Sequence, residues 1–317
     1  MNVQKNDGST DVFVMVPSYN HAPFIARCLS SIIEQTVRPK KLLVIDDGSA
    51  DGSAEIIARI LDTCPFDAEL IVRENRGLCR ILNQGLALSD NKYFAYIGSD
   101  DFWLPTFIES RVEMMESREE AVLGYGHAYL INEQGDAFDS TAKYTDSWGN
   151  YPDGNAREML LAGIAPISST VFYRRAAIEN VGWNEDSRLE DYEMYLRLMN
   201  LGDFAFDPQI LSAWRDHGYN TSKNRVMMLT EVLQAQEGYM TELGIDHDEL
   251  AQIHTKTKFS YARDLLQHGD KIEAMRLAKT SWRGAKSTVQ LLKFVLRMAV
   301  PMGVVNLRRR MKKTRPL

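Results

Sequence analysis

The first part of the chain alternates short apolar runs with longer segments whose apolar residues recur at helical spacing. The runs have the length and composition of strands buried on both faces of a sheet: Val12–Val16, Leu42–Ile45, Glu69–Val72 and Tyr93–Ile97. The segments between them predict amphipathic helices at Ala22–Gln35, Ser53–Leu61 and Leu78–Leu88. Strand, helix and strand at this rhythm predict a mostly parallel sheet flanked by helices that form right-handed crossovers.

Further along, the pattern predicts a helix at Pro105–Arg118, strands at Ala121–Asn132 and Ser168–Tyr173, and a helix at Leu189–Asn200. From Arg225 onward the apolar residues follow helical spacing only. We therefore expect an α/β domain over residues 1–224 and a helical C-terminal region over residues 225–317.

The net charge of −6 conceals a strong asymmetry. Residues 1–273 carry 25 Lys and Arg against 43 Asp and Glu, whereas residues 274–317 carry 12 Lys and Arg and no acid. An acidic body argues against nucleic acid as a partner. The three cysteines have no spacing typical of a zinc site. Because no signal segment or long apolar stretch is present, we expect a cytoplasmic protein.

Polar residues follow three of the predicted strands at the point where each strand ends. They are Pro17-Ser18-Tyr19-Asn20, Asp46-Asp47-Gly48-Ser49 and Gly98-Ser99-Asp100-Asp101. Ligands of parallel α/β sheets bind at the carboxyl ends of the strands. Carboxylates gathered there repel one another unless a hard cation such as Mg²⁺ or Mn²⁺ joins them. Each motif alone is also common in turns and helix caps, so a structural role stays open.

Four segments in order and approximate spacing resemble the family-2 nucleotide-sugar glycosyltransferases. They are Val-Pro-Ser-Tyr-Asn, Val-Ile-Asp-Asp-Gly-Ser, Gly-Ser-Asp-Asp and Leu-Glu-Asp-Tyr-Glu-Met-Tyr-Leu-Arg-Leu, and the resemblance covers about residues 11–222. It implies the GT-A fold, with a Rossmann-like central sheet. It also implies inverting, metal-dependent transfer of a hexose from a nucleotide diphosphate donor, a UDP-sugar being favoured, to an acceptor hydroxyl.

The resemblance also implies a set of nucleotide-binding residues. Tyr19 would stack on the base, Asp47 would accept a hydrogen bond from a ring N–H, and Asp100 would lie near the ribose. The other expected nucleotide contacts are Pro17, Asn20, Asn75, Arg80 and Asn83. A commonly basic position of the family is Leu82 here, and Arg80, two residues earlier, is its expected substitute.

By the same resemblance, Asp101 would coordinate the metal, and the segment Trp214-Arg215-Asp216-His217 would contribute further contacts. His217 is expected as a second metal ligand or a diphosphate contact, although a lone His near a strand end is often structural. Arg215 is expected to bind phosphate.

Asp191 would be the general base that takes the proton from the attacking hydroxyl, which contributes about 10²–10⁴-fold to a rate. Glu190 is a possible contact to the diphosphate or the acceptor. The alternative is that both acids only stabilise the start of a helix through its dipole. The two roles are compatible, because a helix start can present Asp191 to a pocket.

The basic end of the chain contains an amphipathic segment. Leu292, Val295 and Leu296 form an apolar stripe, and basic residues recur from Lys286 to Arg315. This pattern predicts peripheral contact of residues 286–315 with an anionic membrane, on its inner face. It would suit a saccharide or lipid-linked acceptor in surface polysaccharide synthesis. The alternative is a helix packed on the protein with a solvated basic end.

Three other functions agree less well with the sequence. A nucleotidyltransferase normally has a Gly-rich basic loop after the first strand, where this chain has Pro-Ser-Tyr-Asn-His. A sugar-nucleotide-binding scaffold with a decayed site is at odds with the intact Asp47, Asp101 and Asp191. An NAD-dependent oxidoreductase would need phosphate-binding glycines that this sequence lacks.

Overall fold

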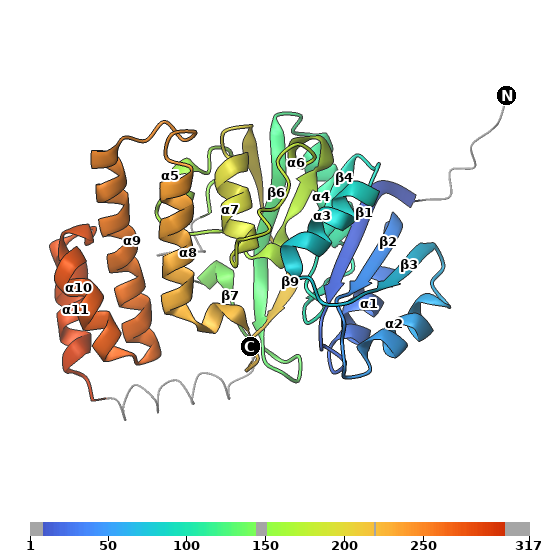
Figure 1. Ribbon diagram of the computed structural model, residues 1–317, viewed down its shortest axis with the longest axis horizontal. Helices are drawn as coiled ribbons and strands as arrows, with labels where there is room; N and C mark the ends of the chain where they lie inside the picture. The colour runs from blue at the N-terminus through green and yellow to red at the C-terminus, as the bar shows by residue number, and fades with distance from the viewer. Residues whose placement is uncertain (1–8, 144–150, 219, 302–317) are drawn as a thin grey trace. The chain divides into compact units, whose positions relative to one another are not determined.

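A computed structural model describes residues 9–143, 151–218 and 220–301 of the chain (Figure 1). Contacts divide it into two compact units, one of residues 1–156 and 165–216 and the other of residues 157–164 and 217–317. The second unit thus begins before the boundary at residues 224 and 225 that the sequence pattern predicts. It also takes in a short earlier segment. The division into two domains stays a prediction.

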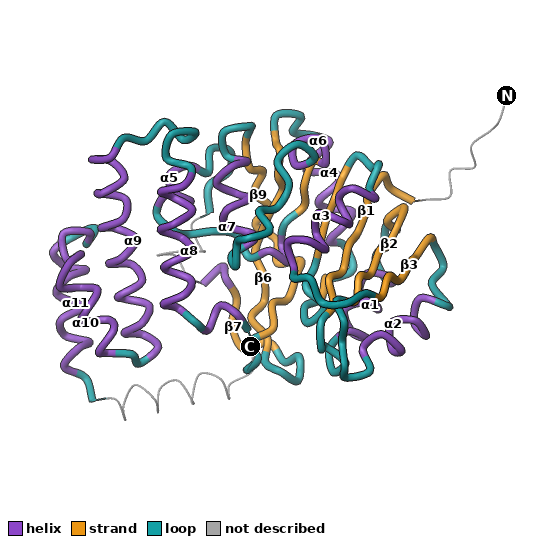
Figure 2. Tube along the Cα trace, in the orientation of Figure 1, coloured by secondary structure: helices purple, strands orange, loops and turns teal. Residues whose placement is uncertain are grey.

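Nine strands within the described residues form one sheet, in the order β3-β2-β1-β4-β8-β6-β9-β5, with β7 paired to β6. Figure 2 draws the strands in orange and the helices in purple. Their bounds are β1 Ser9–Ser18, β2 Arg38–Asp46, β3 Asp67–Val72, β4 Tyr93–Tyr96, β5 Phe102–Trp103, β6 Ala121–Ile131, β7 Ala137–Ser140, β8 Phe172–Arg174 and β9 Asp203–Arg215. β1 pairs in parallel with both β2 and β4, and β2 pairs in parallel with β3. The predicted α/β class with a mostly parallel sheet is confirmed.

The helices of the first unit are α1 Ile25–Ile33, α2 Ser53–Leu61, α3 Leu78–Leu88, α4 Phe107–Glu116, α6 Arg175–Ile178 and α7 Glu190–Leu198. They cover both faces of the sheet, which is why β1 reads as a continuous apolar run. Val14 and Val16 point into the core shared with α1, α2 and α4. Met15 points to the other face, where it packs against Gly85 of α3.

Two predicted helices, 53–61 and 78–88, have the observed bounds. The predicted strand at Ser168–Tyr173 is wrong in its first half. Residues Ser168–Thr170 form a 3₁₀ turn, and the strand β8 begins only at Phe172. The hydroxyl and the backbone N–H of Thr170 both donate to the carbonyl of Ile167, which closes the turn. The long strand β9 was not predicted.

The second unit is helical, as the pattern from Arg225 onward predicts. Its helices are α5 Arg157–Leu161, α8 Arg225–Gly238, α9 His247–His268, α10 Lys271–Ser281 and α11 Thr288–Ala299. Phe294 of α11 is buried in a core that α8, α9 and α10 share. No helix in the described ranges is both long and apolar enough to cross a membrane. Residues 302–317 of the predicted basic tail lie outside the described part of the chain.

Candidate functional site

The loops that follow β1, β2 and β4 meet at one edge of the sheet. In the parallel register Ser18 lies opposite Asp46, and the backbone N–H of Asp47 donates to the carbonyl of Ser18 at 2.8 Å. On the other side of β1, the N–H of Ile97 donates to the carbonyl of Met15 at 3.1 Å. The three polar motifs at the strand ends are therefore neighbours in space.

The loop after β1 is fastened to the loop after β2. Asn20 has a φ of 52°, a left-handed conformation that Asn tolerates better than most residues. Its N–H donates to the hydroxyl of Ser49 at 2.8 Å. Its side-chain oxygen accepts from the backbone N–H of Ala50, which follows Ser49 in the loop after β2. Tyr19 is 50% exposed, so its ring is open to a stacking partner. Pro17 lies within β1, opposite Ile45.

Asp47 holds the segment that follows β3. Its two carboxylate oxygens accept from the backbone N–H groups of Arg76 and Gly77, at 3.0 and 2.8 Å. Its side chain is 3.4 Å from Arg73 Nε and is almost fully buried. Gly48 follows with a φ of +83°, and a Cβ there would lie 3.0 Å from the backbone nitrogen of Asn75. Asp47 thus sets the shape of the loop that contains the predicted donor contacts.

A basic cavity of about 680 Å³ adjoins this loop and is lined by Arg73, Arg76, Arg80, Asn83, Gln84 and Glu185. Two of the predicted nucleotide contacts lie here, but each also has a structural partner. Arg80 pairs with Glu185 at 2.9 Å. The amide of Asn83 both donates to the carbonyl and accepts from the N–H of Trp183, at 2.9 and 2.7 Å. These bonds fasten α3 to the loop that leads into α7.

Asp101 and Arg215 join the loop after β4 to the end of β9. The N–H of Arg215 donates to Asp101 Oδ1 at 2.8 Å, and its Nε donates to the carbonyl of Asp100 at 2.7 Å. Further donations from Arg215 reach the carbonyls of Asn132 and Glu133. Burial, and then the charge of Asp100, raise the pKa of Asp101 well above its usual value. The described hydrogen bonds of Arg215 therefore orient the loop.

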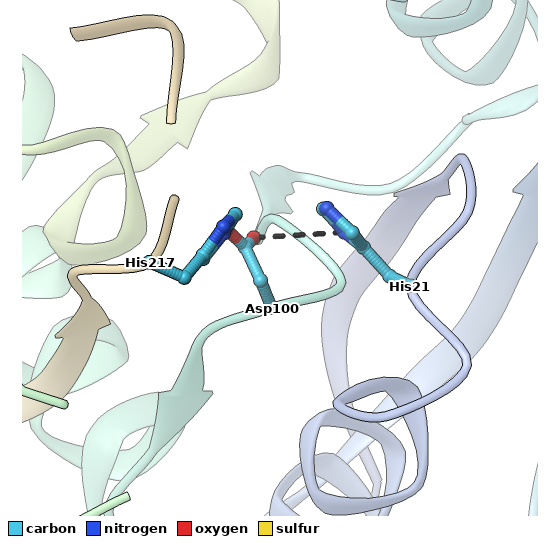
Figure 3. A group of neighbouring side chains, drawn as sticks. All are labelled: His21, Asp100 and His217. Atoms are coloured by element: carbon cyan, nitrogen blue, oxygen red, sulfur yellow. Dashed lines mark ion pairs between the residues drawn. The ribbon is translucent and has the colours of Figure 1, made fainter. Parts of the chain in front are cut away.

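Three side chains at this edge offer ligand atoms that all lie within 4.8 Å of one another: His21, Asp100 and His217 (Figure 3). His217 directly follows Asp216, whose N–H donates to the carbonyl of Ile131, so the course of the chain after β9 determines its position. One carboxylate and two imidazoles suit a divalent cation such as Mn²⁺. The residues brought together include Asp100, for which the sequence predicted a ribose contact, whereas the predicted ligand Asp101 is bonded to backbone.

No pattern in the sequence singled out His21 as a candidate site residue. The signal for it was its position directly after Asn20, on a loop that the topology brings to the same edge as Asp100. A lone His carries no spacing pattern, so only the paired strand ends could have drawn attention to it.

Glu190 and Asp191 lie in the first turn of α7, where acids favour the positive end of the helix dipole. Asp191 Oδ1 accepts from the N–H of Tyr192 at 2.6 Å, and the hydroxyl of Tyr96 donates to Glu190 at 3.5 Å. Burial raises the pKa of Asp191 to about 6. Burial and the neighbouring Asp191 raise the pKa of Glu190 to about 8. Both carboxyls therefore bind a proton more readily than exposed acids do.

The apolar residues behind these acids fix the start of α7. Tyr195 and Leu198 are fully buried. Tyr173 stacks on Tyr96, with ring centroids 6.3 Å apart, and both rings border the two acids. The helix can therefore stabilise acids at its N-terminus and present Asp191 at the same time.

Comparisons with known proteins agree with this architecture. A family described as "Glycosyl transferase family 2" matches residues 13–182. "Chondroitin synthase" from Escherichia coli is 29% identical over 212 residues, which are 67% of this chain and 30% of that protein. "UDP-Glc:alpha-D-GlcNAc-diphosphoundecaprenol beta-1,3-glucosyltransferase WfaP" from Escherichia coli is 24% identical over 238 residues, covering 74% of this chain and 87% of that protein. The chain spans 30% and 52% of the length of two curated relatives.

Among solved structures, the mannosyltransferase PcManGT from Pyrobaculum calidifontis, in complex with GDP-Man and Mn²⁺, superposes with a TM-score of 0.61. The alignment covers 97% of this chain and 88% of that one, at 15% identity. At 15% identity this similarity shows a shared fold and nothing about the reaction. The predicted GT-A fold is confirmed.

Proposed function

Because the chain belongs to glycosyl transferase family 2, we propose that it is an inverting hexosyltransferase that uses a nucleotide diphosphate sugar. The acceptor is a hydroxyl of a saccharide. The observation that supports this most directly is that Asp100 and His217 offer ligand atoms within 4.8 Å of each other, at the edge where ligands of parallel sheets bind. A charged diphosphate needs a cationic partner at such an edge, and a divalent ion held by these side chains would provide one.

The donor nucleotide lies over the loops after β1 and β2 in this proposal. Tyr19 stacks on the base, and Asp47 accepts a hydrogen bond from the base while it keeps the loop of Arg76 and Gly77 in shape. A carboxylate has about four lone-pair sites, so two backbone donors leave capacity for the base. A UDP-sugar is favoured, since the name of the relative WfaP specifies UDP-Glc, while PcManGT was solved with GDP-Man.

Asp100 and His217 hold the divalent cation, Mn²⁺ or Mg²⁺, in our proposal. When bound, the ion neutralises charge on the departing diphosphate. Asp101, the ligand predicted from the sequence, acts through Arg215 by fixing the loop that carries Asp100. The other residues around the diphosphate are Asn75, Arg80 and Asn83, which lie on or beside the basic cavity.

Asp191 acts as the general base. The acceptor oxygen attacks the anomeric carbon from the side opposite the diphosphate, and its proton passes to a carboxylate oxygen of Asp191. The bond from the anomeric carbon to the phosphate oxygen breaks, and its electron pair leaves with the nucleoside diphosphate. A pKa of about 6 keeps Asp191 ionised at neutral pH while leaving it a stronger base than an ordinary Asp. Glu190 lies beside it in the first turn of the same helix.

The acceptor is presented at an anionic membrane surface in this proposal, as a lipid-linked saccharide in polysaccharide synthesis. The name of WfaP specifies a diphosphoundecaprenol-linked acceptor. Support from this chain comes from α11, where Val289, Leu292, Val295 and Leu296 are each more than half exposed. Lys293 and Arg297 of the same helix are exposed as well. Exposed apolar and basic residues on one helix suit peripheral binding to the inner face of a membrane.

Calorimetric titration with UDP, dTDP and GDP, each with and without Mn²⁺, tests the proposal. We expect one of the three to bind in a Mn²⁺-dependent manner, and transfer or slow hydrolysis of the matching sugar donor. Nucleotide binding with no turnover of any donor would favour a binding scaffold. Release of pyrophosphate from a nucleoside triphosphate and a sugar phosphate would identify a nucleotidyltransferase instead.

A further inference from the structure

The loop after β1 carries a histidine whose ring faces the carboxylate of Asp100 (Figure 3). His21 Nδ1 lies 4.0 Å from Asp100 Oδ1 and 2.7 Å from the hydroxyl of Ser99. We propose that His21 is a third protein ligand of the divalent cation, beside Asp100 and His217. The proposal rests on the proposed function, because that function requires a cation at this edge.

The spacing of the three groups fits one small ion. Ligand atoms lie about 2.0–2.2 Å from a bound Zn²⁺ or Mg²⁺, so two ligands of one ion can be separated by roughly 4 Å. The three ligand atoms lie within 4.8 Å of one another. A shift of a few tenths of an ångström by each side chain would therefore bring all three to bonding distance.

Three contacts hold His21 in place. Its backbone N–H donates to the hydroxyl of Ser53 at 3.1 Å, and its ring meets the edge of Phe24 at 5.9 Å between centroids. The hydroxyl of Ser99, a residue that is 1% exposed, fixes the ring orientation through its hydrogen bond to Nδ1. Partners of this kind orient a ligating imidazole and reduce the entropy lost when it binds a metal.

The donor set has a consequence for metal preference. One carboxylate with two imidazoles suits transition ions, whereas Mg²⁺ is usually held by carboxylates, water and substrate phosphates. With His21 as a ligand, the protein supplies three ligands before any nucleotide arrives. We therefore expect the protein alone to bind Mn²⁺ more tightly than Mg²⁺, and Co²⁺ more tightly than Mn²⁺.

The test is a Mn²⁺ titration of the metal-stripped full chain without nucleotide, followed by the electron paramagnetic resonance signal of free Mn²⁺. We expect one bound ion in the wild type and at least tenfold weaker binding in His21→Ala. His247→Ala, an exposed histidine at the start of α9, is the matched control and should bind Mn²⁺ like the wild type. Melting curves of each variant establish that the fold is intact.

Two further measurements make the result specific to ligation. Electron spin echo modulation from ¹⁴N coupled to Mn²⁺ should weaken in His21→Ala, because one of two coordinating imidazoles is lost. His21→Asp, which exchanges nitrogen for oxygen, should lower the preference for Mn²⁺ over Mg²⁺ in a competition titration. Unchanged modulation in His21→Ala, or an unchanged preference in His21→Asp, would overturn the proposal.

Equal Mn²⁺ affinity of wild type and His21→Ala would also overturn it, as would a wild type that binds no Mn²⁺ without nucleotide. Either failure is distinguishable from failure of the proposed function. If Mn²⁺-dependent UDP or GDP binding persists in the calorimeter, the nucleotide site stands and only the role of His21 is wrong. If no nucleotide binds while Mn²⁺ does, the metal site stands and the transferase proposal fails.

Discussion

The backbone N–H of Arg215 donates to Oδ1 of Asp101 at 2.8 Å, and this bond joins the end of β9 to the loop after β4. Two neighbouring carboxylates thereby acquire different surroundings. Asp101 is 5% exposed and bonded to the backbone, while the side chain of Asp100 lies beside His21 and His217. The two adjacent acids of this motif thus differ in position: one lies beside the two histidines at the edge of the sheet, and the other fixes the loop.

This difference predicts that substitutions of the two acids have different effects on nucleotide binding. Asp100→Ala should weaken Mn²⁺-dependent nucleotide binding at least tenfold in calorimetry, because it removes the charged ligand. Asp101→Asn, whose side-chain oxygen can still accept from Arg215, should leave most of that binding intact. If Asp101→Asn abolishes binding and Asp100→Ala does not, the metal ligand is Asp101, as the sequence motif suggests.

Asp191→Asn should reduce the transfer rate by about 10²–10⁴-fold, the usual contribution of a general base, and leave nucleotide affinity nearly unchanged. Asn keeps the shape of the side chain but cannot take the proton. Single-turnover transfer together with calorimetry on the same preparation measures both quantities. Asp186→Asn, an exposed acid on the loop before α7, serves as the control. Equal transfer by wild type and Asp191→Asn would remove the base assignment.

The raised pKa of Asp191 predicts a pH profile. Because only the ionised carboxylate accepts a proton, kcat/KM should rise with pH through about 6 and then level off. Below that pH the base is protonated, and the rate should fall tenfold for each pH unit. Glu190, with a pKa of about 8, interacts with it, so the two titrate as a pair. Glu190→Gln should keep the acidic limb, and a flat profile between pH 5 and 8 would contradict the role of Asp191.

Part of this arrangement could be predicted from the sequence because the signals are local. Residues 53–61 and 78–88 have helical periodicity of sufficient length, and the buried runs at 12–16 and 42–45 have no polar interruption. Once the strands are parallel, their polar ends must gather at one edge, so Asp47 and Asp100 could be placed together in advance.

The remainder depends on contacts between distant segments. The segment Asp203–Arg215 contains Asp, Pro and Gln among its apolar residues, and its register with β6 shifts, so no regular alternation identified it as a strand. The choice between Asp100 and Asp101 depends on a hydrogen bond from a residue 114 positions away. The contacts of His21 with Ser99 and Asp100 come from the loop after β4, and no local pattern reveals them.

Replacing either of two glycines of the helical unit with alanine should change stability, in opposite directions. A Cβ on Gly284 would lie 2.7 Å from the carbonyl carbon of Thr255, in the backbone of α9, which cannot move aside easily. Gly284→Ala should therefore lower the free energy of unfolding by about 1–3 kcal/mol, as overpacking does. Gly238→Ala at the end of α8 meets no atom within 4 Å and should raise it by up to about 1 kcal/mol. Urea unfolding measures both, and equal effects would contradict this packing argument.

The exposed face of α11 predicts binding to anionic lipid. Leu292→Asp and Leu296→Asp place charge on a face that is more than half exposed, so the fold should persist while insertion into lipid is lost. Burial of one Leu is worth about 1.5–3 kcal/mol, so each change should weaken sedimentation with phosphatidylglycerol vesicles roughly tenfold or more. Val226→Asp, at an exposed position on α8, is the matched control and should bind like the wild type.

Neutral phosphatidylcholine vesicles should bind none of the proteins well, because the basic residues of α11 need an anionic surface. If all variants bind anionic vesicles equally, this face of α11 does not enter the membrane.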